Sequence, residues 1–483
     1  MPLNSHRWLF LAASLLALEA RAQPARLRAA PAVASPTRTA KVGNAEFWLT
    51  TPDKSALFQR QPDRLAFGTV PNTNPTVEVD DAQTFQTMDG FGYCLTGGSA
   101  ELLHKMEAPK RAQLLRELFA TSGPGIGVSY LRVSIGASDL DARVFSYDDL
   151  PAGQTDPTLT KFSLAPDQPH LIPVLKEILA LNPGLKILGS PWSPPTWMKT
   201  NDNSKGGSLK PEFYDAYAQY FVKYLQGMQA AGIRVDAITI QNEPLHPGNN
   251  PSLLMLAGQQ AEFIKKSLGP AFRAAGLDTK IIVYDHNADR PDYPIGILND
   301  PAARVYVDGS AFHLYAGKIE ALAQVHAAHP DKNLYFTEQW VGSKTTFESN
   351  LGWHVKNLLI GATRNWARTV LEWNLAADPQ QNPHTPGGCT ECLGALTLAG
   401  NAVTRNPAYY IIAHASKFVR PGSVRIGSTA AGVLPNAAFR TPAGGRVLIV
   451  QNDQATAQAF WVGYGGRTFR STLNAGAVGT YVW

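Results

Sequence analysis

The sequence of 483 residues is poor in cysteine and has no cluster of basic residues. Three cysteines are too few for disulfides to hold a chain of this length together. The net charge of +5 is spread thinly, and no run of lysine or arginine predicts a nucleic-acid partner. After the first residues, no apolar stretch approaches the ~18 residues of a membrane span, so we expect a mature protein without one.

The first 22 residues have the pattern of a secretory signal peptide. A short basic start precedes the apolar run Trp8 to Leu18, and Ala20-Arg21-Ala22 forms an Ala-x-Ala cleavage site. An uncleaved anchor is the alternative, but the run is short for a spanning helix. We therefore expect a secreted or periplasmic protein with a flexible leader over residues 23–42, which are rich in Ala, Pro, Arg and Thr.

Two of the three cysteines lie close together in Cys389-Thr390-Glu391-Cys392. This spacing admits a local redox pair, a tight disulfide or, with His384, an incomplete metal site. Zinc prefers four ligands and only three candidates are near, so we expect no metal there. Cys94 ends an apolar run and is expected to be a small buried residue.

Apolar runs alternate with helical periods through the middle of the chain. Large apolar residues spaced three and four positions apart predict helices. These helices are expected over Pro109 to Phe119, Pro169 to Leu181, Glu212 to Met228, Leu253 to Ala275 and Phe347 to Trp366. Eight runs are predicted as strands: Met88 to Cys94, Val128 to Gly136, Lys186 to Trp192, Asp236 to Asn242, Lys280 to Asn287, Val307 to Tyr315, Asn333 to Trp340 and Arg368 to Ala376. Eight strands alternating with helices predict an α/β fold, the (β/α)8 TIM barrel.

Both ends of the chain are predicted to be β structure outside the barrel. Late strands are expected at Arg425-Ile426-Gly427, Gly432-Val433-Leu434, Arg446 to Gln451, Ala459 to Val462 and Gly479 to Trp483, after a last helix over Pro407 to Val419. Neither end can bury a face alone, so we expect one shared β-sandwich side domain. The predicted domains are signal peptide 1–22, leader 23–42, N-terminal sandwich strands 43–80, barrel 81–419 and C-terminal sandwich 420–483.

Two of the predicted strands end in a glutamate. The apolar run from Ala237 continues into Gln241-Asn242-Glu243-Pro244, where proline ends the strand, and Asn333 to Trp340 carries Glu338 in the same way. The carboxyl ends of barrel strands share one rim, so we expect the two glutamates to face each other there. Hydrolysis of a glycosidic bond requires such a pair, although a single strand-end glutamate is often an ion-paired or solvated structural residue.

Polar and aromatic residues are expected at the same strand ends. Aromatic faces stack on pyranose rings, while carboxylates, amides and guanidinium groups bind hydroxyls. Structural alternatives remain: the two tryptophans between Ser190 and Trp197 could be loop packing, and Arg132 could pair with a barrel carboxylate. Besides the glutamates, the candidates are Asp89, Arg132, Asp139, Trp192, Trp197, Asn242, His313, Tyr315, Trp373 and Asn374.

Six motifs, in order along the chain, resemble glycoside hydrolase family 30, which contains lysosomal-type glucosylceramidases and microbial β-1,6-glucanases. They are Asp89-Gly90-Phe91-Gly92, Arg132 with Asp139, Ser190-Pro191-Trp192 with Pro195 to Asn201, Gln241 to Pro244, Phe336-Thr337-Glu338 and Glu372-Trp373-Asn374-Leu375. The resemblance runs from about Thr84 to the end and implies a barrel with a sandwich built from both termini. It implies that Glu243 is the acid/base, that Glu338 is the nucleophile, and that a sugar subsite is lined by Arg132, Asp139, Trp192, Asn242, His313, Tyr315 and Trp373.

The expected activity is that of a secreted, retaining, glucosylceramidase-like β-glycosidase acting by double displacement. An endo-β-1,6-glucanase is the alternative within the family, and a noncatalytic glycan-binding protein is the alternative outside it. Burial and the charge of Glu338 are expected to raise the pKa of Glu243, while Arg132 or another donor favours ionised Glu338. The expected partner is a β-glucoside, either a glucan or a glucosyl lipid, and the chemistry needs no metal or organic cofactor.

Overall fold

The structure is a computed structural model that describes residues 43–69, 75–429 and 433–483. The predicted signal peptide and leader lie outside these residues. Barrel and side domain belong to one compact unit. No helix in the described ranges is both long and apolar enough to cross a membrane.

Eight parallel strands close into the predicted barrel, and they neighbour each other in chain order, with the last strand paired to the first. All eight predicted runs form these strands. They are β4 (Gly90–Cys94), β5 (Tyr130–Ser134), β6 (Lys186–Ser190), β7 (Ala237–Thr239), β8 (Lys280–Ala288), β9 (Val307–Gly317), β10 (Asn333–Glu338) and β12 (Ala367–Asn374). Seven of the strands each contribute one side chain to a buried cluster: Tyr130, Leu188, Ala237, Ile282, Ala311, Tyr335 and Leu371. The barrel is therefore a packed core, and its rim is free to carry the chemistry.

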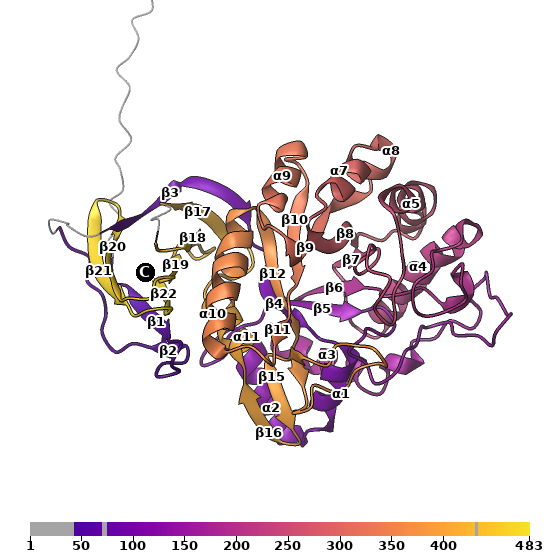
Figure 1. The fold of residues 1–483 in the computed structure, drawn as a ribbon, viewed down its shortest axis with the longest axis horizontal. Helices are drawn as coiled ribbons and strands as arrows, with labels where there is room; N and C mark the ends of the chain where they lie inside the picture. Colours follow the sequence, from indigo (N-terminus) through magenta and orange to yellow (C-terminus); the bar gives the residue numbers. More distant parts are fainter. Residues whose placement is uncertain (1–42, 70–74, 430–432) are drawn as a thin grey trace, which may run out of the picture. The chain divides into compact units, whose positions relative to one another are not determined.

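The helices are arranged around the barrel strands (Figure 1). Their bounds are α1 (Gly97–Lys105), α2 (Ala108–Phe119), α3 (Leu171–Leu181), α4 (Tyr214–Ala230), α5 (Ala257–Phe263), α6 (Gly269–Ala274), α7 (Asp292–Leu298), α8 (Pro301–Arg304), α9 (Ala321–Ala328), α10 (Phe347–His354) and α11 (Pro407–Ser416). The predicted helix Leu253 to Ala275 is interrupted by a π-helical turn over Ile264–Leu268. A second π-helical stretch, Val355–Ala362, continues α10.

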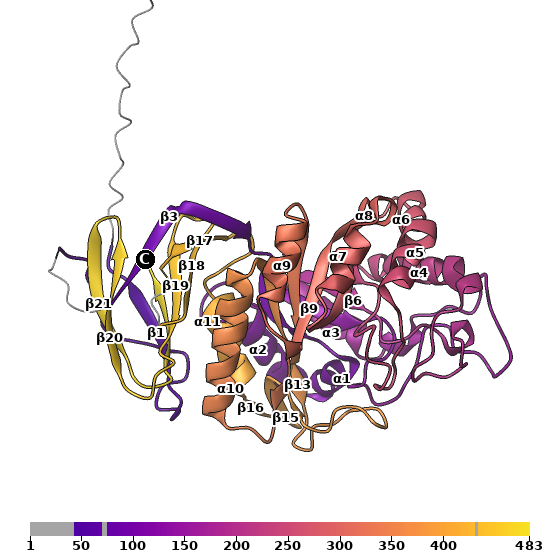
Figure 2. The same ribbon diagram turned by 45° about the horizontal axis from the view of Figure 1, so that its top comes forward.

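The two ends of the chain form one nine-stranded β structure with its own apolar core, which confirms the predicted sandwich. Figure 2 shows the early strands lying among the late ones. The strand order is β2 (Gln59–Arg60), β1 (Glu46–Thr50), β22 (Val478–Val482), β19 (Arg446–Gln451), β18 (Asn436–Arg440), β17 (Val424–Ser428), β3 (Thr76–Thr87), β20 (Gln458–Tyr464) and β21 (Arg467–Leu473). The strand predicted at Gly432 to Leu434 is wrong in its described part, because Val433 and Leu434 precede β18 without forming a named strand.

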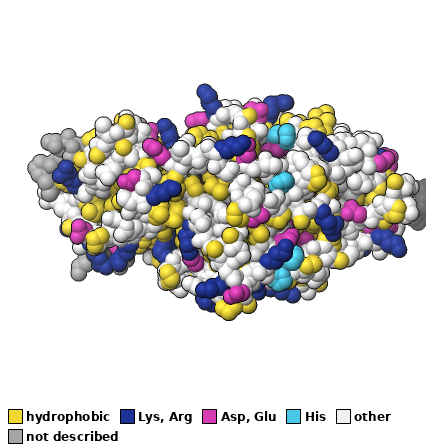
Figure 3. Space-filling view, turned by 60° about the horizontal axis from the view of Figure 1, so that its bottom comes forward, with side chains coloured by type: hydrophobic (Ala, Val, Ile, Leu, Met, Phe, Trp, Pro, Cys, Tyr) yellow, Lys and Arg dark blue, Asp and Glu magenta, His cyan; other side chains and the backbone are white. Residues whose placement is uncertain are grey.

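The face of the molecule in Figure 3 carries basic and acidic side chains interspersed with apolar ones. Three short strand pairings complete the fold near the barrel rim. They involve β11 (Val341–Gly342), β13 (Ala376–Ala377), β14 (Cys392–Leu393), β15 (Leu396–Ala399) and β16 (Ala402–Arg405). The antiparallel pairing of β11 with β14 brings the cysteine loop beside the strand that ends in Glu338.

Candidate active site

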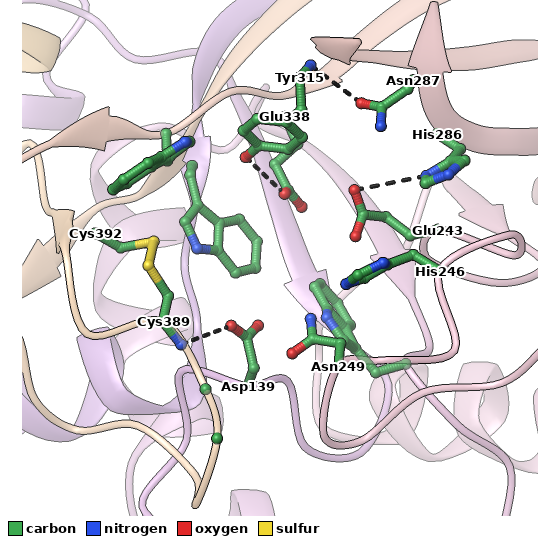
Figure 4. A pocket seen from close by; sticks show the side chains of 15 residues that line it. Asp139, Glu243, His246, Asn249, His286, Asn287, Tyr315, Glu338, Cys389 and Cys392 are labelled. Carbon is green, nitrogen blue, oxygen red and sulfur yellow. Dashed lines mark hydrogen bonds and ion pairs between the residues drawn. A yellow bond between two sulfur atoms is a disulfide. The ribbon is translucent and has the colours of Figure 1, made fainter. Parts of the chain in front are cut away.

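A cavity of about 360 Å³ opens at the carboxyl ends of the barrel strands. Six of the predicted site residues line it: Asp139, Trp192, Glu243, Tyr315, Glu338 and Trp373. Figure 4 shows Glu243 and Glu338 projecting toward the same space. Three more, Arg132, Asn242 and His313, are buried and hydrogen-bonded to residues of the cavity or to one another.

Arg132, on β5, is the centre of a buried hydrogen-bond network. Its Nη1 donates to Glu338 Oε2 at 2.5 Å. Its Nη2 lies within hydrogen-bond distance of Asn242 Oδ1 (2.6 Å), Asp285 Oδ2 (2.8 Å) and Ser190 Oγ (3.1 Å). A buried guanidinium is stable only with such partners, so the arginine and the two carboxylates require each other. The alternative expected for Arg132 was a pairing with a barrel carboxylate. That pairing is present, with Asp285, and it holds Arg132 in the site.

Asp285, on β8, is a carboxylate that sequence reasoning missed. It is fully buried and accepts hydrogen bonds from Arg132, from the hydroxyl groups of Ser190 and Thr239 (2.8 and 2.7 Å), and from that of Thr337 (2.7 Å). Burial raises its pKa, but the charge of Arg132, the hydrogen bond and charge of His313 and the hydrogen bond from Thr337 outweigh burial and hold the pKa well below its usual range. Its signal in the sequence was an acidic residue that directly follows the apolar run Ile281 to Tyr284.

Glu243 lies four residues beyond the end of β7, in a bend with φ of 44°. Few residues other than glycine adopt this left-handed conformation, so the surrounding structure must hold it in place. The backbone N–H of Glu243 donates to the carbonyl oxygen of Asp285 at 2.9 Å, which ties the bend to β8. Pro244 has no backbone N–H, so the strand pairing cannot continue through it.

His313, on β9, lies between the two glutamates. Its Nδ1 is 3.2 Å from Glu243 Oε1 and 3.9 Å from Glu338 Oε1, so those oxygens cannot be farther apart than the sum of the two distances. That bound excludes a separation of about 9 Å and admits the ~5–5.5 Å of a retaining glycosidase. Tyr315, two residues along β9, donates its hydroxyl hydrogen to Glu338 Oε1 at 2.9 Å.

The pKa values of the two glutamates differ from expectation in one respect. Burial raises the pKa of Glu338, and the charges of His313 and Arg132 oppose that rise without cancelling it. Burial also raises the pKa of Glu243, but contacts with His286 and His313 outweigh burial and hold it below its usual range. The expectation of a raised pKa at Glu243 was therefore wrong, because it took no account of the two histidines.

Glu243 and His313 share a proton through a hydrogen bond. Burial alone would lower the pKa of His313, but the charge of Glu338 and the hydrogen bonds to Asp285 and Glu243 raise it to about 9. Because Asp285 is ionised, His313 Nε2 keeps its hydrogen, which points to Asp285 Oδ1 at 3.2 Å. The second proton lies in the hydrogen bond between His313 Nδ1 and Glu243 Oε1, on the His313 side, because the pKa of His313 is raised and that of Glu243 is lowered.

Two aromatic rings cover Arg132. Its guanidinium carbon lies 4.7 Å from the ring centroid of Trp192 and 5.7 Å from that of Trp373, and the two rings are 5.4 Å apart. Cation–π contacts of this kind fix the rings against the guanidinium. Both rings also line the cavity, as predicted.

The three remaining strand-end candidates, Trp197, Asp89 and Asn374, also do not line the cavity. Trp197 donates its Nε1 hydrogen to the carbonyl oxygen of Asp148 at 3.0 Å and packs against Phe213, so its loop-packing alternative holds. Asp89 precedes β4, at the opposite end of the barrel, and pairs with Arg368 at 2.8 Å. Asn374 is buried at the end of β12.

The cysteine loop forms one wall of the cavity. Cys389 and Cys392 are joined by a disulfide, which was one of the three alternatives, and both line the cavity. The backbone N–H of Cys389 donates to Asp139 Oδ2 at 3.3 Å, so the loop positions a predicted sugar-binding carboxylate. Burial is the main cause that raises the pKa of Asp139 to about 7, and the charge of Glu338 adds to it. Cys94 is buried and unpaired, as predicted.

Further cavity residues were not predicted from the sequence. His246 and Asn249 come from the loop after β7, His286 and Asn287 from β8, and Trp340 from the segment after β10. Their only sequence signal was proximity to a predicted strand end. Ligand atoms of Glu243, His286 and His313 lie within 4.8 Å of one another, a spacing that a divalent cation could span. Both ring nitrogens of His313 are already engaged, however, in the proton network described above.

Known proteins with similar sequences and structures identify the family to which this site belongs. Residues 88–419 match the glycosyl hydrolase family 30 TIM-barrel domain, and residues 422–481 match the family 30 beta sandwich domain. An endo-1,6-beta-D-glucanase of Neurospora crassa is 38% identical over 405 residues, covering 79% of this chain and 83% of the relative. The lysosomal acid glucosylceramidase of Mus musculus is 31% identical over 441 residues, covering 85% and 84%. A solved endo-beta1,6-glucanase structure superposes with a TM-score of 0.84 at 35% identity, covering 91% of this chain and 99% of that chain.

Proposed function

This chain belongs to glycosyl hydrolase family 30 and is a β-glycosidase, and from that premise we propose that it is a retaining endo-β-1,6-glucanase. Glu338 is the nucleophile and Glu243 is the acid/base in this proposal. Two contacts support these roles. Both carboxylates lie near one nitrogen of His313, and of the two glutamates only Glu338 is bonded to Arg132.

In the first step, a Glu338 oxygen attacks the anomeric carbon and the glycosidic bond breaks. The proton shared by Glu243 and His313 moves to the departing oxygen, so the leaving group departs as a neutral alcohol. Arg132 and Tyr315 hold the attacking carboxylate in position through their hydrogen bonds. The sugar is then covalently bound to Glu338.

In the second step, water replaces the leaving group. Glu243 accepts a proton from the water as its oxygen attacks the anomeric carbon, and Glu338 is released as a carboxylate. Two inversions give net retention of configuration. Asn242 is suited to bind the sugar 2-hydroxyl, because Arg132 occupies its Oδ1 and leaves the amide nitrogen available. Trp192, Trp373 and Asp139 supply the remaining sugar contacts in this proposal.

The choice of β-1,6-glucan rests on the relatives. Endo-1,6-beta-D-glucanases from Neurospora crassa, Aspergillus fumigatus and Trichoderma harzianum are 38%, 36% and 34% identical to this chain. Glucosylceramide is the second candidate, favoured by the 31% identity to the murine glucosylceramidase over most of both chains. The expected glucosylceramidase-like activity thus becomes the second proposal.

Product analysis on three substrates tests the proposal: β-1,6-glucan, an aryl β-glucoside and glucosylceramide in detergent micelles. We expect short β-1,6-linked oligosaccharides from the glucan, initially with the β anomer at the new reducing end by NMR. Release of glucose alone would argue against endo action. A higher kcat/KM on glucosylceramide than on the glucan would favour the second candidate, and initial α anomers would overturn retention.

We also propose that the protein is exported after removal of residues 1–22. The support is the sequence pattern alone, since these residues lie outside the described structure. Mass spectrometry of the mature protein, after expression with its own N-terminus, should find Gln23 as the first residue in the medium or periplasm. An intact Met1 in the membrane fraction would instead indicate an uncleaved anchor.

A further inference from the structure

One side of the cavity consists of polar residues that take no part in the two proposed reaction steps, although His286 also contacts Glu243. Figure 4 shows Asn287, His286, His246 and Asn249 along the side that carries Glu243, across from the Cys389–Cys392 disulfide. The group that Glu243 protonates must depart on this side, because acid and leaving oxygen have to be in contact. These four side chains therefore surround the path of the leaving group.

The amide groups of Asn249 and Asn287 are both held in a single orientation. Asn249 Oδ1 accepts the backbone N–H of Asn250 at 2.9 Å, and Asn287 Oδ1 accepts that of Tyr315 at 3.0 Å. A backbone N–H can be bonded only by the amide oxygen, so each bond determines which way the amide is turned. Neither amide nitrogen donates to any other residue in the described part of the chain. Each residue thus presents free N–H donors at the cavity.

The backbone that carries these donors is held in place. Asn287 belongs to barrel strand β8. Asn249 is followed by Asn250, whose carbonyl oxygen accepts the Thr385 hydroxyl at 2.6 Å and whose Nδ2 donates to the carbonyl oxygen of Pro386 at 3.0 Å. The side-chain oxygen of Asn250 also accepts the Ser204 hydroxyl at 2.9 Å. Donors that are fixed before binding lose little conformational entropy when a ligand arrives.

We infer that Asn249 and Asn287 form a leaving-group subsite that binds the hydroxyl oxygens of a sugar. This inference rests on the proposed function and specifies its substrate on the leaving-group side. A sugar offers several hydroxyl acceptors to fixed N–H donors. The apolar chains of a lipid would leave those donors without partners, and that costs binding free energy. The subsite therefore selects a carbohydrate over a ceramide.

Transfer of the sugar to an acceptor tests the subsite separately from formation of the covalent intermediate. An aryl β-glucoside loads Glu338, and a β-1,6-linked glucose disaccharide is then added to compete with water for the intermediate. The ratio of transfer product to free glucose measures binding at the leaving-group subsite. Both reactions use Glu243 as base, so a changed acid/base pKa largely cancels from the ratio.

Asn249→Asp and Asn287→Asp are the decisive variants, because aspartate keeps the oxygen that holds the backbone N–H and loses the donor. We expect each to lower the transfer ratio about five- to tenfold, the effect of one lost hydrogen bond. Asn249→Ala and Asn287→Ala should lower it at least as much. Asn203→Ala is the matched control, since Asn203 is an exposed rim-loop residue that does not line the cavity, and its ratio should equal that of the unaltered protein.

Unchanged ratios in both aspartate variants would overturn the inference. So would a loss of transfer in the alanine variants that the aspartate variants do not share, because the side chains would then act only by holding the backbone. If the unaltered protein did not hydrolyse the aryl β-glucoside at all, the proposed function would fail first, and this inference would fail with it.

Discussion

At the scale of single residues, the site depends on a balance of buried charges. Arg132 is fully buried and pairs with Asp285 at 2.8 Å and with Glu338 at 2.5 Å. Within the described part of the chain, Glu243 contacts no arginine or lysine, and it contacts His286 and His313 instead. The glutamate bonded to the permanent cation is suited to attack as a carboxylate, and the one bonded to an imidazole is suited to exchange a proton.

Substitution of each glutamate should separate their roles. Glu243→Ala removes proton transfer, so kcat/KM on β-1,6-glucan should fall by about 10²- to 10⁴-fold. An aryl β-glucoside with a good leaving group should still load Glu338, and azide should then release the β-glucosyl azide, identified by NMR. Glu338→Ala should abolish activity on every substrate, because no covalent intermediate can form. An α-azide from the Glu243 variant would mean that the two roles are reversed.

The proton shared by His313 and Glu243 predicts the alkaline limb of the pH profile. The pKa of His313 is raised from its ordinary 6.5 to about 9, so the pair keeps its proton below that pH and loses it above. We expect kcat/KM on β-1,6-glucan to be maintained to about pH 8 and to fall as the pH rises through about 9. The azide-rescued Glu243→Ala variant should lack this limb. A fall centred near 6.5 in the unaltered protein would contradict the shared proton.

At the scale of elements, the sandwich depends on its last strand. β22 pairs with β1 on one side and β19 on the other, so it joins the N-terminal strands to the C-terminal ones. Tyr481 on this strand is fully buried and stacks on Phe47 with ring centroids 4.7 Å apart. Its removal would expose two strand edges and part of the sandwich core.

Deletion of Gly479 to Trp483 should therefore give insoluble protein. Sedimentation of the expressed protein would measure this, with Trp483→Ala as a control that keeps β22 and should remain soluble. Unpaired edges of β1 and β19 are the expected cause, since open edges pair with other chains. A soluble, fully active truncation would show that the sandwich is dispensable.

At the scale of the whole molecule, α11 connects the barrel to the sandwich. His414 on this helix lies 2.8 Å from Thr480 Oγ1 through Nδ1 and 2.8 Å from Thr50 Oγ1 through Nε2. Thr480 belongs to β22 and Thr50 to β1, so one side chain contacts both ends of the chain. Burial lowers the pKa of His414 to about 3, and the ring is neutral at physiological pH.

We expect barrel and sandwich to unfold in one transition that weakens in acid. The folded pKa of His414 lies below its ordinary 6.5, so its contribution to stability is complete above about pH 6.5 and decreases as the pH falls toward about 3. Calorimetry should show one peak at pH 7. His414→Leu should lower the free energy of unfolding there by about 1–3 kcal/mol, and by less at pH 4.5. Two separate peaks, or an equal loss at both pH values, would contradict this coupling.

The sequence by itself determined the number and order of the barrel strands, the sandwich built from both termini and the two glutamates. These follow from short-range patterns, such as the apolar run that Pro244 ends just after Glu243, and a strand end in a barrel lies at a known rim. Tertiary structure alone decided the directions of Trp197 and Asp89, the disulfide between Cys389 and Cys392, and the roles of Asp285 and His313 in setting charge. The disulfide joins residues only three apart, and their spacing alone left three alternatives open. The other outcomes depend on contacts between residues far apart in the chain, and a buried pKa responds to atoms a few ångströms away that no local pattern reveals.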